Sequence, residues 1–203
     1  MVAGGVEAMS RVPMGGFNPS FNPRLIKARE GEESSLSYPP CELEYGYSSY
    51  IPMGMTAENL ARQYNISREA QDAFALRSHQ RAIAAMDSGV FKREIVPVPL
   101  PNGRLMEVDE GPRRDTSLAR LASLEPAFIK GGSVTAGNSR PLYDGVSVVV
   151  LMSAQKARDM GITPLAKIRT MAVAGVDPAY MGIGPVPAMR KLLQRSGLQL
   201  SDI

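Results

Sequence analysis

The sequence predicts an α/β fold, and three observations carry that prediction. The last third of the 203 residues alternates apolar, β-branched runs with segments that have helix caps, which is typical of a layered α/β core. The segment 67–88 has small and apolar residues at every fourth position, the spacing of one helix face. Hydrophobic residues make up 44% and charged residues 21% of the chain, near the averages of globular proteins, so a buried core is available.

The first 51 residues predict a strand end followed by a long loop. Met1-Val2-Ala3 runs straight into Gly4-Gly5, as at the end of a strand whose beginning lies outside the sequence, so we expect a fragment. From Arg11 to Ile51 the chain is rich in Pro, Gly, Ser, Asn and Tyr and has no period of 2 or 3.6. Such a segment predicts an irregular excursion over a surface.

Two helices are predicted next. Thr56 is suited to cap a short helix through Tyr64, and Asn65 tolerates the left-handed conformation at its end. Ser67 is suited to cap the second helix, which ends at Gly89. One stripe of this helix is made of small residues with two large anchors: Ala70, Phe74, Ser78, Ala82 and Met86. So narrow a stripe predicts close packing on another element.

The middle of the chain predicts a hairpin and a short helix. Residues 94–100 are β-branched but contain two prolines, which suits an edge strand because proline cannot donate to a central ladder. Residues 104–108 are the expected partner, across a turn that carries Asn102-Gly103. A short helix is expected from Ser117 to Leu124, before Pro126.

The last third carries the α/β pattern itself. Val146–Met152 is apolar on both faces, which predicts a strand buried in a covered sheet. A helix at 154–160 with Gly161 as its end, a strand at 165–176 and a helix that runs from Pro185 to Ser196 are expected to follow.

Composition excludes several classes of function. The net charge of +3 comes from interspersed residues, which gives no concentrated field for nucleic acid. One cysteine and one histidine cannot form a disulfide framework or a structural zinc site, so no metal is expected. No apolar run approaches the roughly 18 residues of a membrane span, and the first residues do not resemble a secretory signal. A cytoplasmic protein is expected.

The residues alone give no complete catalytic constellation. Cys41 lies beside two glutamates, which disfavour a thiolate, and His79 lies among cations, so structural or solvent-facing roles are favoured for both. Gly182-Ile183-Gly184-Pro185 could cradle a phosphate at a helix start, but a simple turn into a helix is favoured, because proline removes a donor. The polar segment 138–145 precedes a strand, where it is either a ligand rim or a turn.

Seven motifs in the chain resemble those of one enzyme family, in that family's order. They are 3–10 (AGGVEAMS), 53–59 (MGMTAEN), 67–72 (SREAQD), 126–128 (PAF), 134–138 (VTAGN), 144–145 (DG) and 175–188 (GVDPAYMGIGPVPA). Together they resemble the middle of a thiolase, and most of all the 3-ketoacyl-CoA and acetyl-CoA acyltransferases.

The resemblance implies a fold of thiolase-like layered core pieces that flank an inserted helical loop domain. Residues 1–10 would end a strand of the N-terminal core, and residues 11–138 would form the loop domain. Residues 139–161 would return to the N-terminal core, and residues 162–203 would start the C-terminal half of the core.

The resemblance also implies the chemistry. Thiolases cleave a 3-ketoacyl-CoA, or join two acyl groups, through an acyl-cysteine intermediate, and coenzyme A is a substrate rather than a cofactor. Their catalytic groups lie in Cys-Ala-Ser-Gly, Asn-Glu-Ala-Phe, Gly-His and Cys-Gly-Gly motifs, none of which occurs in these 203 residues. No catalytic residue is therefore expected in this chain.

The resemblance assigns binding residues for coenzyme A. Arg113 matches an arginine near the adenine nucleotide, and Phe128 matches an aromatic residue beside the pantetheine arm. Ala136 and Leu142 match residues that line the same groove.

Two more residues match the family's acyl pocket, and two others differ from the residue that the family often has at their position. Met53 and Met181 match residues around the acyl pocket, where a flexible thioether suits varied acyl tails. Arg140 stands where the family often has a serine that touches the pantetheine, and Pro52 stands where it often has a histidine. An arginine at this place either intrudes on the thioester channel or meets a phosphate, which puts the usual pose of coenzyme A in question.

Two function classes remain open. In the first, the chain is the acyl-CoA-binding portion of a thiolase and works with complementing thiolase segments. In the second, it is a non-catalytic assembly module that packs against copies of itself through the small-residue stripe and the loop domain. A truncation without a role of its own is a third alternative. Self-association is expected in each case, because unpaired strand edges are covered wherever they can be.

Overall fold

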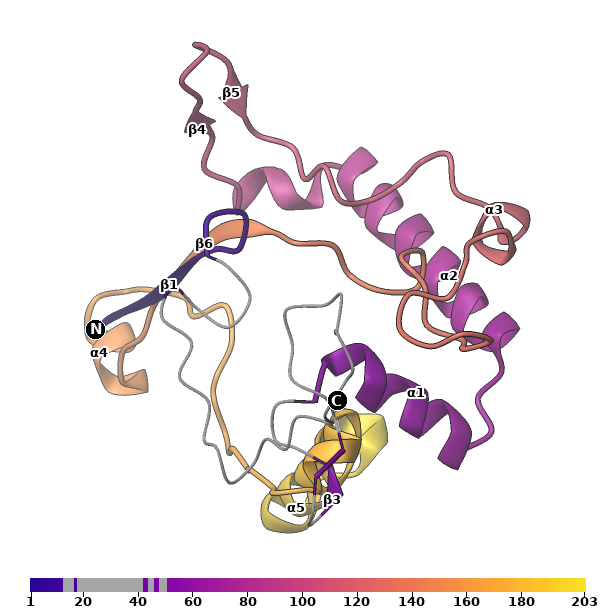
Figure 1. Cartoon of the computed structure of the whole chain (residues 1–203). Helices are drawn as coiled ribbons and strands as arrows, with labels where there is room; N and C mark the ends of the chain where they lie inside the picture. Colours follow the sequence, from indigo (N-terminus) through magenta and orange to yellow (C-terminus); the bar gives the residue numbers. More distant parts are fainter. Residues whose placement is uncertain (13–16, 18–41, 44–45, 48–50) are drawn as a thin grey trace. The chain divides into compact units, whose positions relative to one another are not determined.

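The computed structural model describes residues 1–12, 17, 42–43, 46–47 and 51–203 (Figure 1). The chain divides into two compact units: unit 1 comprises Met1–Thr56 and Leu142–Ile203, and unit 2 comprises Ala57–Pro141. Cys41 and most of the predicted loop between Arg11 and Ile51 lie outside the described residues.

The main sheet of unit 1 pairs two strands far apart in the sequence. Strand β1 (Val2–Ala8) runs antiparallel to β6 (Asp144–Val150), with Val2 opposite Val150 and Ala8 opposite Asp144 (Figure 1). Gly4 is required by this pairing, because a Cβ there would lie 2.9 Å from the carbonyl oxygen of Ser147. A strand forms at both predicted places, but β1 continues through Gly4-Gly5 to Ala8 rather than ending at Ala3, and β6 begins and ends two residues earlier than predicted. Two shorter strands, β2 (Glu42–Leu43) and β3 (Gly46–Tyr47), form a separate antiparallel pair.

The predicted burial of the 146–152 strand is wrong. Val146 is 71% exposed and Val149, on the opposite face, is 53% exposed. In the described part of the chain, β6 pairs only with β1 in a two-stranded sheet. An apolar strand is buried only when neighbouring elements cover both of its faces, and the residue pattern of β6 does not supply that cover.

A side-chain contact closes the end of this sheet. The Ser10 hydroxyl donates to Oδ2 of Asp144 at 2.5 Å, and the Ser10 backbone N–H donates to Oδ1 at 2.9 Å. Both hydrogen bonds stabilise the carboxylate and hold the pKa of Asp144 below its usual range, with the charge of Arg11 acting in the same direction.

Replacing Ser10 by alanine is expected to raise the pKa of Asp144, because the hydroxyl donor is lost. A carboxyl pKa that is lowered on folding stabilises the protein above the unfolded value of about 3.9, and this stabilisation disappears as the pH falls through the folded value. Carboxyl ¹³C chemical shifts followed from pH 6 to pH 2 measure the effect. Ser153→Ala, which removes a helix cap in the same unit, should leave the pKa of Asp144 unchanged; equal titrations in S10A and the parent chain would contradict the assignment.

The helices of unit 1 follow their local signals. Helix α4 (Ala154–Asp159) begins after Ser153, whose Oγ accepts from the backbone N–H of Lys156 at 3.1 Å. Helix α5 (Pro185–Ser196) ends before Gly197, which is left-handed with φ of +70°. The 3₁₀ helices η3 (Pro178–Ile183) and η4 (Leu200–Asp202) flank α5. These boundaries confirm the predicted helices.

The strand predicted at 165–176 is not formed. Residues 165–176 contain no strand, and Leu165 is completely exposed. β-branched sequence favours an extended backbone, but a strand also needs a hydrogen-bonded neighbour. No such neighbour pairs with this segment among the residues that the structure describes.

Unit 2 begins at Ala57, within helix α1 (Met53–Gln63), and also contains helix α2 (Arg68–Asp87). Helix α1 begins three residues before the predicted Thr56 cap, and the Thr56 hydroxyl instead donates to the Met53 carbonyl at 2.8 Å. Asn65 is left-handed with φ of +51°, as predicted. Helix α2 begins after Ser67, whose Oγ accepts from the Ala70 N–H at 3.2 Å. Both ends of α2 agree with the prediction.

The predicted small-residue stripe of α2 is covered only in part. Ala70, Phe74 and Ser78 are exposed, Phe74 by 64%, and Ala82 and Met86 are half-buried, whereas Asp72, on another face, is 3% exposed. Asp72 is bonded to Arg68 and to groups outside the helix, and these polar contacts fix the inward face. Apolar periodicity alone could not have indicated it.

The rest of unit 2 is made of short elements. The 3₁₀ helix η2 (Val90–Arg93) leads to the strands β4 (Val98–Pro99) and β5 (Leu105–Met106). The two strands pair as predicted but are shorter, with a left-handed Gly103 in the turn (Figure 1). Helix α3 (Leu118–Ala122) lies within the helix predicted at 117–124, and Ser117 caps it by accepting from the Arg120 N–H at 3.2 Å.

Candidate functional site

The loop 126–138 presents two of the predicted binding residues. Pro126 and Thr135 form an isolated antiparallel bridge, and the Ala127 N–H donates to the Val134 carbonyl at 2.9 Å. Val134 is 5% exposed and Thr135 is completely buried, whereas Phe128 and Ala136 are exposed. The loop is therefore anchored through its interior residues while Phe128 and Ala136 remain accessible.

A buried carboxylate of α1 binds the backbone of this loop. Glu58 is 4% exposed, and its oxygens accept from the backbone N–H of Ser133 at 2.9 and 3.0 Å and from that of Val134 at 2.8 Å. The Ser133 hydroxyl donates to Glu58 Oε2 at 3.0 Å. Burying a carboxylate is unfavourable unless such donors compensate for lost water, and here two successive amides and a hydroxyl do so.

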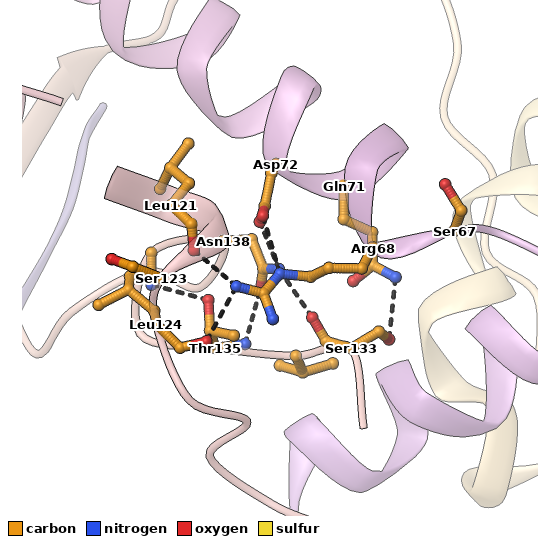
Figure 2. A network of polar contacts seen from close by, with 12 residues as sticks. Ser67, Arg68, Gln71, Asp72, Leu121, Ser123, Leu124, Ser133, Thr135 and Asn138 are labelled. Atoms are coloured by element: carbon orange, nitrogen blue, oxygen red, sulfur yellow. Dashed lines mark hydrogen bonds and ion pairs between the residues drawn. The ribbon is translucent and has the colours of Figure 1, made fainter. Parts of the chain in front are cut away.

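Asn138 and Asp72 close the other end of the loop (Figure 2). Asn138 Oδ1 accepts from the Thr135 N–H at 2.8 Å, while its Nδ2 donates to the Ser133 carbonyl at 2.9 Å and to Asp72 Oδ1 at 3.1 Å. The other oxygen of Asp72 accepts from Arg68 Nε at 2.8 Å. One amide side chain thus bonds both the loop and α2.

Arg68 joins α2 to the end of α3 (Figure 2). Its Nη2 donates to the carbonyls of Leu121 at 2.6 Å and Leu124 at 3.0 Å. These carbonyls lie at the C-terminal end of α3, where a helix lacks internal donors and where a positive charge is favourable. Gln71 adds a hydrogen bond from its Nε2 to the Ser133 hydroxyl at 2.9 Å.

The segment that carries Arg113 is held by α2. The Arg113 backbone N–H donates to His79 Nδ1 at 3.2 Å, so the histidine has the structural role that the sequence favoured. Arg114 binds both carboxylate oxygens of Asp87, at 2.6 and 2.9 Å. The guanidinium holds the pKa of Asp87 below its usual range, and the carboxylate raises that of Arg114. The Arg113 side chain remains exposed.

Comparison with known proteins identifies the family. A model described as the thiolase N-terminal domain matches residues 1–155, and one described as the thiolase C-terminal domain matches residues 162–203. The chain belongs to the thiolase family. The resemblance carried by the seven sequence motifs is thereby confirmed.

Two curated thiolases are similar over the whole chain. The 3-ketoacyl-CoA thiolase of Marinobacter nauticus is 46% identical over all of this chain and 48% of its own length. That of Bacillus subtilis is 44% identical over all of this chain and 50% of its own length. The chain spans about half the length of these thiolases.

Solved thiolases share the fold. The acetyl-CoA acetyltransferase of Bacillus anthracis is 45% identical with a TM-score of 0.78, over 99% of this chain and 50% of its own. The dimeric peroxisomal thiolase of Saccharomyces cerevisiae is 38% identical with a TM-score of 0.82, over 100% and 48%. Human mitochondrial 3-ketoacyl-CoA thiolase, solved with CoA, is 36% identical with a TM-score of 0.77, over 100% and 50%. The mixed helix and strand content agrees with these thiolases.

The residues that the thiolase resemblance assigned are distributed over both units. Unit 2 contains Arg113, Phe128, Ala136 and Arg140, and unit 1 contains Met53, Leu142 and Met181. All are exposed, Met53 by 66%, Leu142 by 61% and Met181 by 41%. The structure brings Phe128 and Ala136 into one loop.

Sequence reasoning missed the residues that hold this loop. Glu58, Asp72 and Asn138 all lie within family motifs, and Asn138 also begins the polar segment 138–145, but none of the three was given a role in holding the loop. A signal was available, because Arg68 and Asp72 are four residues apart, the spacing of an ion pair on one helix face.

Other candidate sites have structural roles. The segment 182–185 is a turn, as favoured, in which η3 runs into α5 through a helical Gly184 with φ of −49°. Asp144, at the end of the polar segment 138–145, is bonded to Ser10. The described residues contain no group of three potential metal ligands among His, Cys, Asp and Glu. None of their helices is long and apolar enough to cross a membrane.

Proposed function

We propose that the chain forms the acyl-CoA-binding portion of a thiolase, an acyltransferase that cleaves 3-ketoacyl-CoA or condenses acetyl-CoA. The observation that supports this most directly is its similarity to 3-ketoacyl-CoA thiolases along its entire length, at 44% and 46% identity. A related human thiolase has been solved with CoA. Coenzyme A acts here as a substrate, and no bound cofactor is proposed.

The proposed binding residues combine apolar and cationic surfaces. Phe128 and Ala136, presented on the loop 126–138, would contact the pantetheine arm, and Arg113 would bind the nucleotide end, where a guanidinium suits phosphate. The remaining members of the proposed site are Met53 and Met181 at the acyl pocket, Leu142 in the groove, and Arg140 where a serine is common in the family.

The catalytic groups are proposed to lie outside the 203 residues of this chain. The catalytic motifs expected of a thiolase do not occur in the 203 residues. In this proposal residues 11–138 are the loop domain, and residues 1–10, 139–161 and 162–203 are pieces of the core that complementing thiolase segments would complete. The scarcity of cysteine supports a reducing compartment, for which we propose the cytoplasm.

Coenzyme A is expected to bind the 203-residue chain in titration calorimetry. Phe128→Ala should weaken the affinity about tenfold, since it removes an aromatic contact at the pantetheine arm. Phe74→Ala is a matched control, because Phe74 is an exposed phenylalanine of the same unit and is outside the proposed site. Absence of binding by the parent chain would contradict the proposed function, and equal losses in both variants would contradict the role of Phe128.

Mixing the chain with CoA and acetoacetyl-CoA tests whether the catalytic groups lie outside the 203 residues. No thiolysis is expected, and turnover would show that the chain itself contains the catalytic groups.

A second candidate is a thiolase-derived assembly module without catalytic function. It is favoured by the β1–β6 sheet, whose valines are exposed on both faces, Val146 by 71% and Val149 by 53%. Exposed apolar strands pair readily with other copies of a chain. A stable oligomer in light scattering together with no heat from CoA would favour this candidate over acyl-CoA binding.

A further inference from the structure

We infer that Glu58 is a positioning residue for the coenzyme A wall, by which we mean the exposed side chains of Phe128 and Ala136. The Glu58 carboxylate fixes the backbone of the loop that carries both residues. This inference rests on the proposed function, since it concerns the same binding surface. Nothing in the assignment of binding residues by family resemblance gives Glu58 a role.

The carboxylate contacts the loop mainly through its backbone. Glu58 accepts hydrogen bonds of 2.8–3.0 Å from the amides of Ser133 and Val134 and from the Ser133 hydroxyl. Glu58 and Val134 are both buried, so the bond between them is sheltered from water, and the bonds to Ser133 are partly buried. Hydrogen bonds to a charged acceptor are stronger than neutral ones and hold the two amides in a fixed direction.

The loop fits closely around this carboxylate. A Cβ at Gly132 would lie 2.4 Å from Glu58 Oε1, so only glycine allows the chain to pass at this distance. The Gly132 N–H donates to the Ile129 carbonyl at 3.0 Å, and this turn connects Phe128 to the amides that Glu58 binds. The side chain and the loop are therefore matched in shape.

A main-chain hydrogen bond links this position to Phe128, and the chain itself links it to Ala136. On one side, the Val134 carbonyl accepts from the Ala127 N–H at 2.9 Å, and Ala127 immediately precedes Phe128. On the other side, the fully buried Thr135 immediately precedes Ala136. Removing the carboxylate is expected to release both residues together. A wall held in place before the ligand arrives lowers the ordering cost of binding.

The test compares Glu58→Gln and Glu58→Ala in the 203-residue chain. Coenzyme A affinity is measured by titration calorimetry, and backbone order by hydrogen exchange at the Ser133 and Val134 amides. Glu58→Ala is expected to weaken coenzyme A binding about tenfold, because the wall must be ordered on binding. Exchange at both amides should accelerate by about tenfold or more. Glu58→Gln, which keeps one acceptor oxygen, should give smaller changes in the same direction.

Asn65→Ala is the control for a general loss of stability. It places alanine at the left-handed φ of +51° in the same unit, so it should lower the melting temperature and leave coenzyme A affinity unchanged. If Glu58→Ala does not fold, coenzyme A affinity and amide exchange are measured on Glu58→Gln and on Gly132→Ala, whose added Cβ crowds the carboxylate.

The outcomes separate this inference from the proposed function. Folded Glu58 variants that bind coenzyme A like the parent chain would overturn the positioning role, as would an equal loss of affinity in Asn65→Ala. A parent chain that does not bind coenzyme A would contradict the proposed function instead. In that case, unchanged amide exchange in the Glu58 variants would overturn the positioning role as well.

Discussion

Replacing Arg68 by alanine is expected to lower the free energy of unfolding by about 3–5 kcal/mol, the usual cost of breaking one side of a buried ion pair. Asp72, which is 3% exposed, would lose its guanidinium partner and keep the hydrogen bond from the Asn138 amide. The carbonyls of Leu121 and Leu124 would lose the guanidinium donor at the end of α3, and the Leu121 carbonyl would keep the Leu124 N–H at 3.1 Å. Urea unfolding followed by far-ultraviolet circular dichroism measures the loss.

Two further variants sharpen this test. Arg81→Ala removes an exposed arginine from the same helix and should change stability by no more than about 0.5 kcal/mol. The double variant Arg68→Ala/Asp72→Ala should cost less than the two single changes added together, because no unpaired charge remains buried. If Arg68→Ala destabilised the chain no more than Arg81→Ala, the network would not hold α2 and α3 together.

Gly137→Ala is expected to destabilise the chain by about 1–3 kcal/mol, the range for overpacking a filled site. The added Cβ would lie 2.5 Å from Leu121 Cδ2 and 2.6 Å from Leu124 Cδ1, and Leu121 is 2% exposed. Leu124 is 38% exposed and can turn away, but the buried Leu121 has little room to move, so the clash with Leu121 shifts either that side chain or the loop backbone. Thermal unfolding monitored by circular dichroism measures the cost.

Gly175→Ala is the matched control for this substitution. A Cβ at Gly175 meets nothing within 4 Å, and its φ lies outside the left-handed region. This change should be neutral or slightly stabilising, because alanine restricts the unfolded chain more than glycine does. Equal melting temperatures in the two variants would contradict the close contact between Gly137 and α3.

Features set by a few neighbouring residues were predictable from sequence. Ser67 caps α2, Gly197 ends α5, and Asn65 is left-handed, each for a reason that is local to the chain. Features that depend on distant partners were not predictable. β6 has the composition of a buried strand but is exposed, and residues 165–176 form no strand, because a sheet requires neighbours that the segment itself does not specify.

The exposed residues of the candidate site could be predicted from the sequence, but the buried residues that hold its loop could not. Family motifs pointed to Phe128 and Ala136, whereas Glu58 and Asp72 are acidic residues on helices, where sequence patterns predict a solvated face. Their burial is possible only because distant amides and Arg68 supply hydrogen bonds. Such pairing is decided by tertiary contacts that no periodicity encodes.

The backbone anchoring of the loop bears on how this surface can evolve. Glu58 and Asn138 accept hydrogen bonds from the main-chain amides of residues 133–135, which directly precede the exposed Ala136. The methyl group of Ala136 contributes none of the described hydrogen bonds that shape the loop. A larger or polar side chain at this position would change the surface that a ligand contacts, while the hydrogen bonds that hold the loop would remain. Position 136 is therefore the place to start a substitution library that changes what the proposed coenzyme A surface binds.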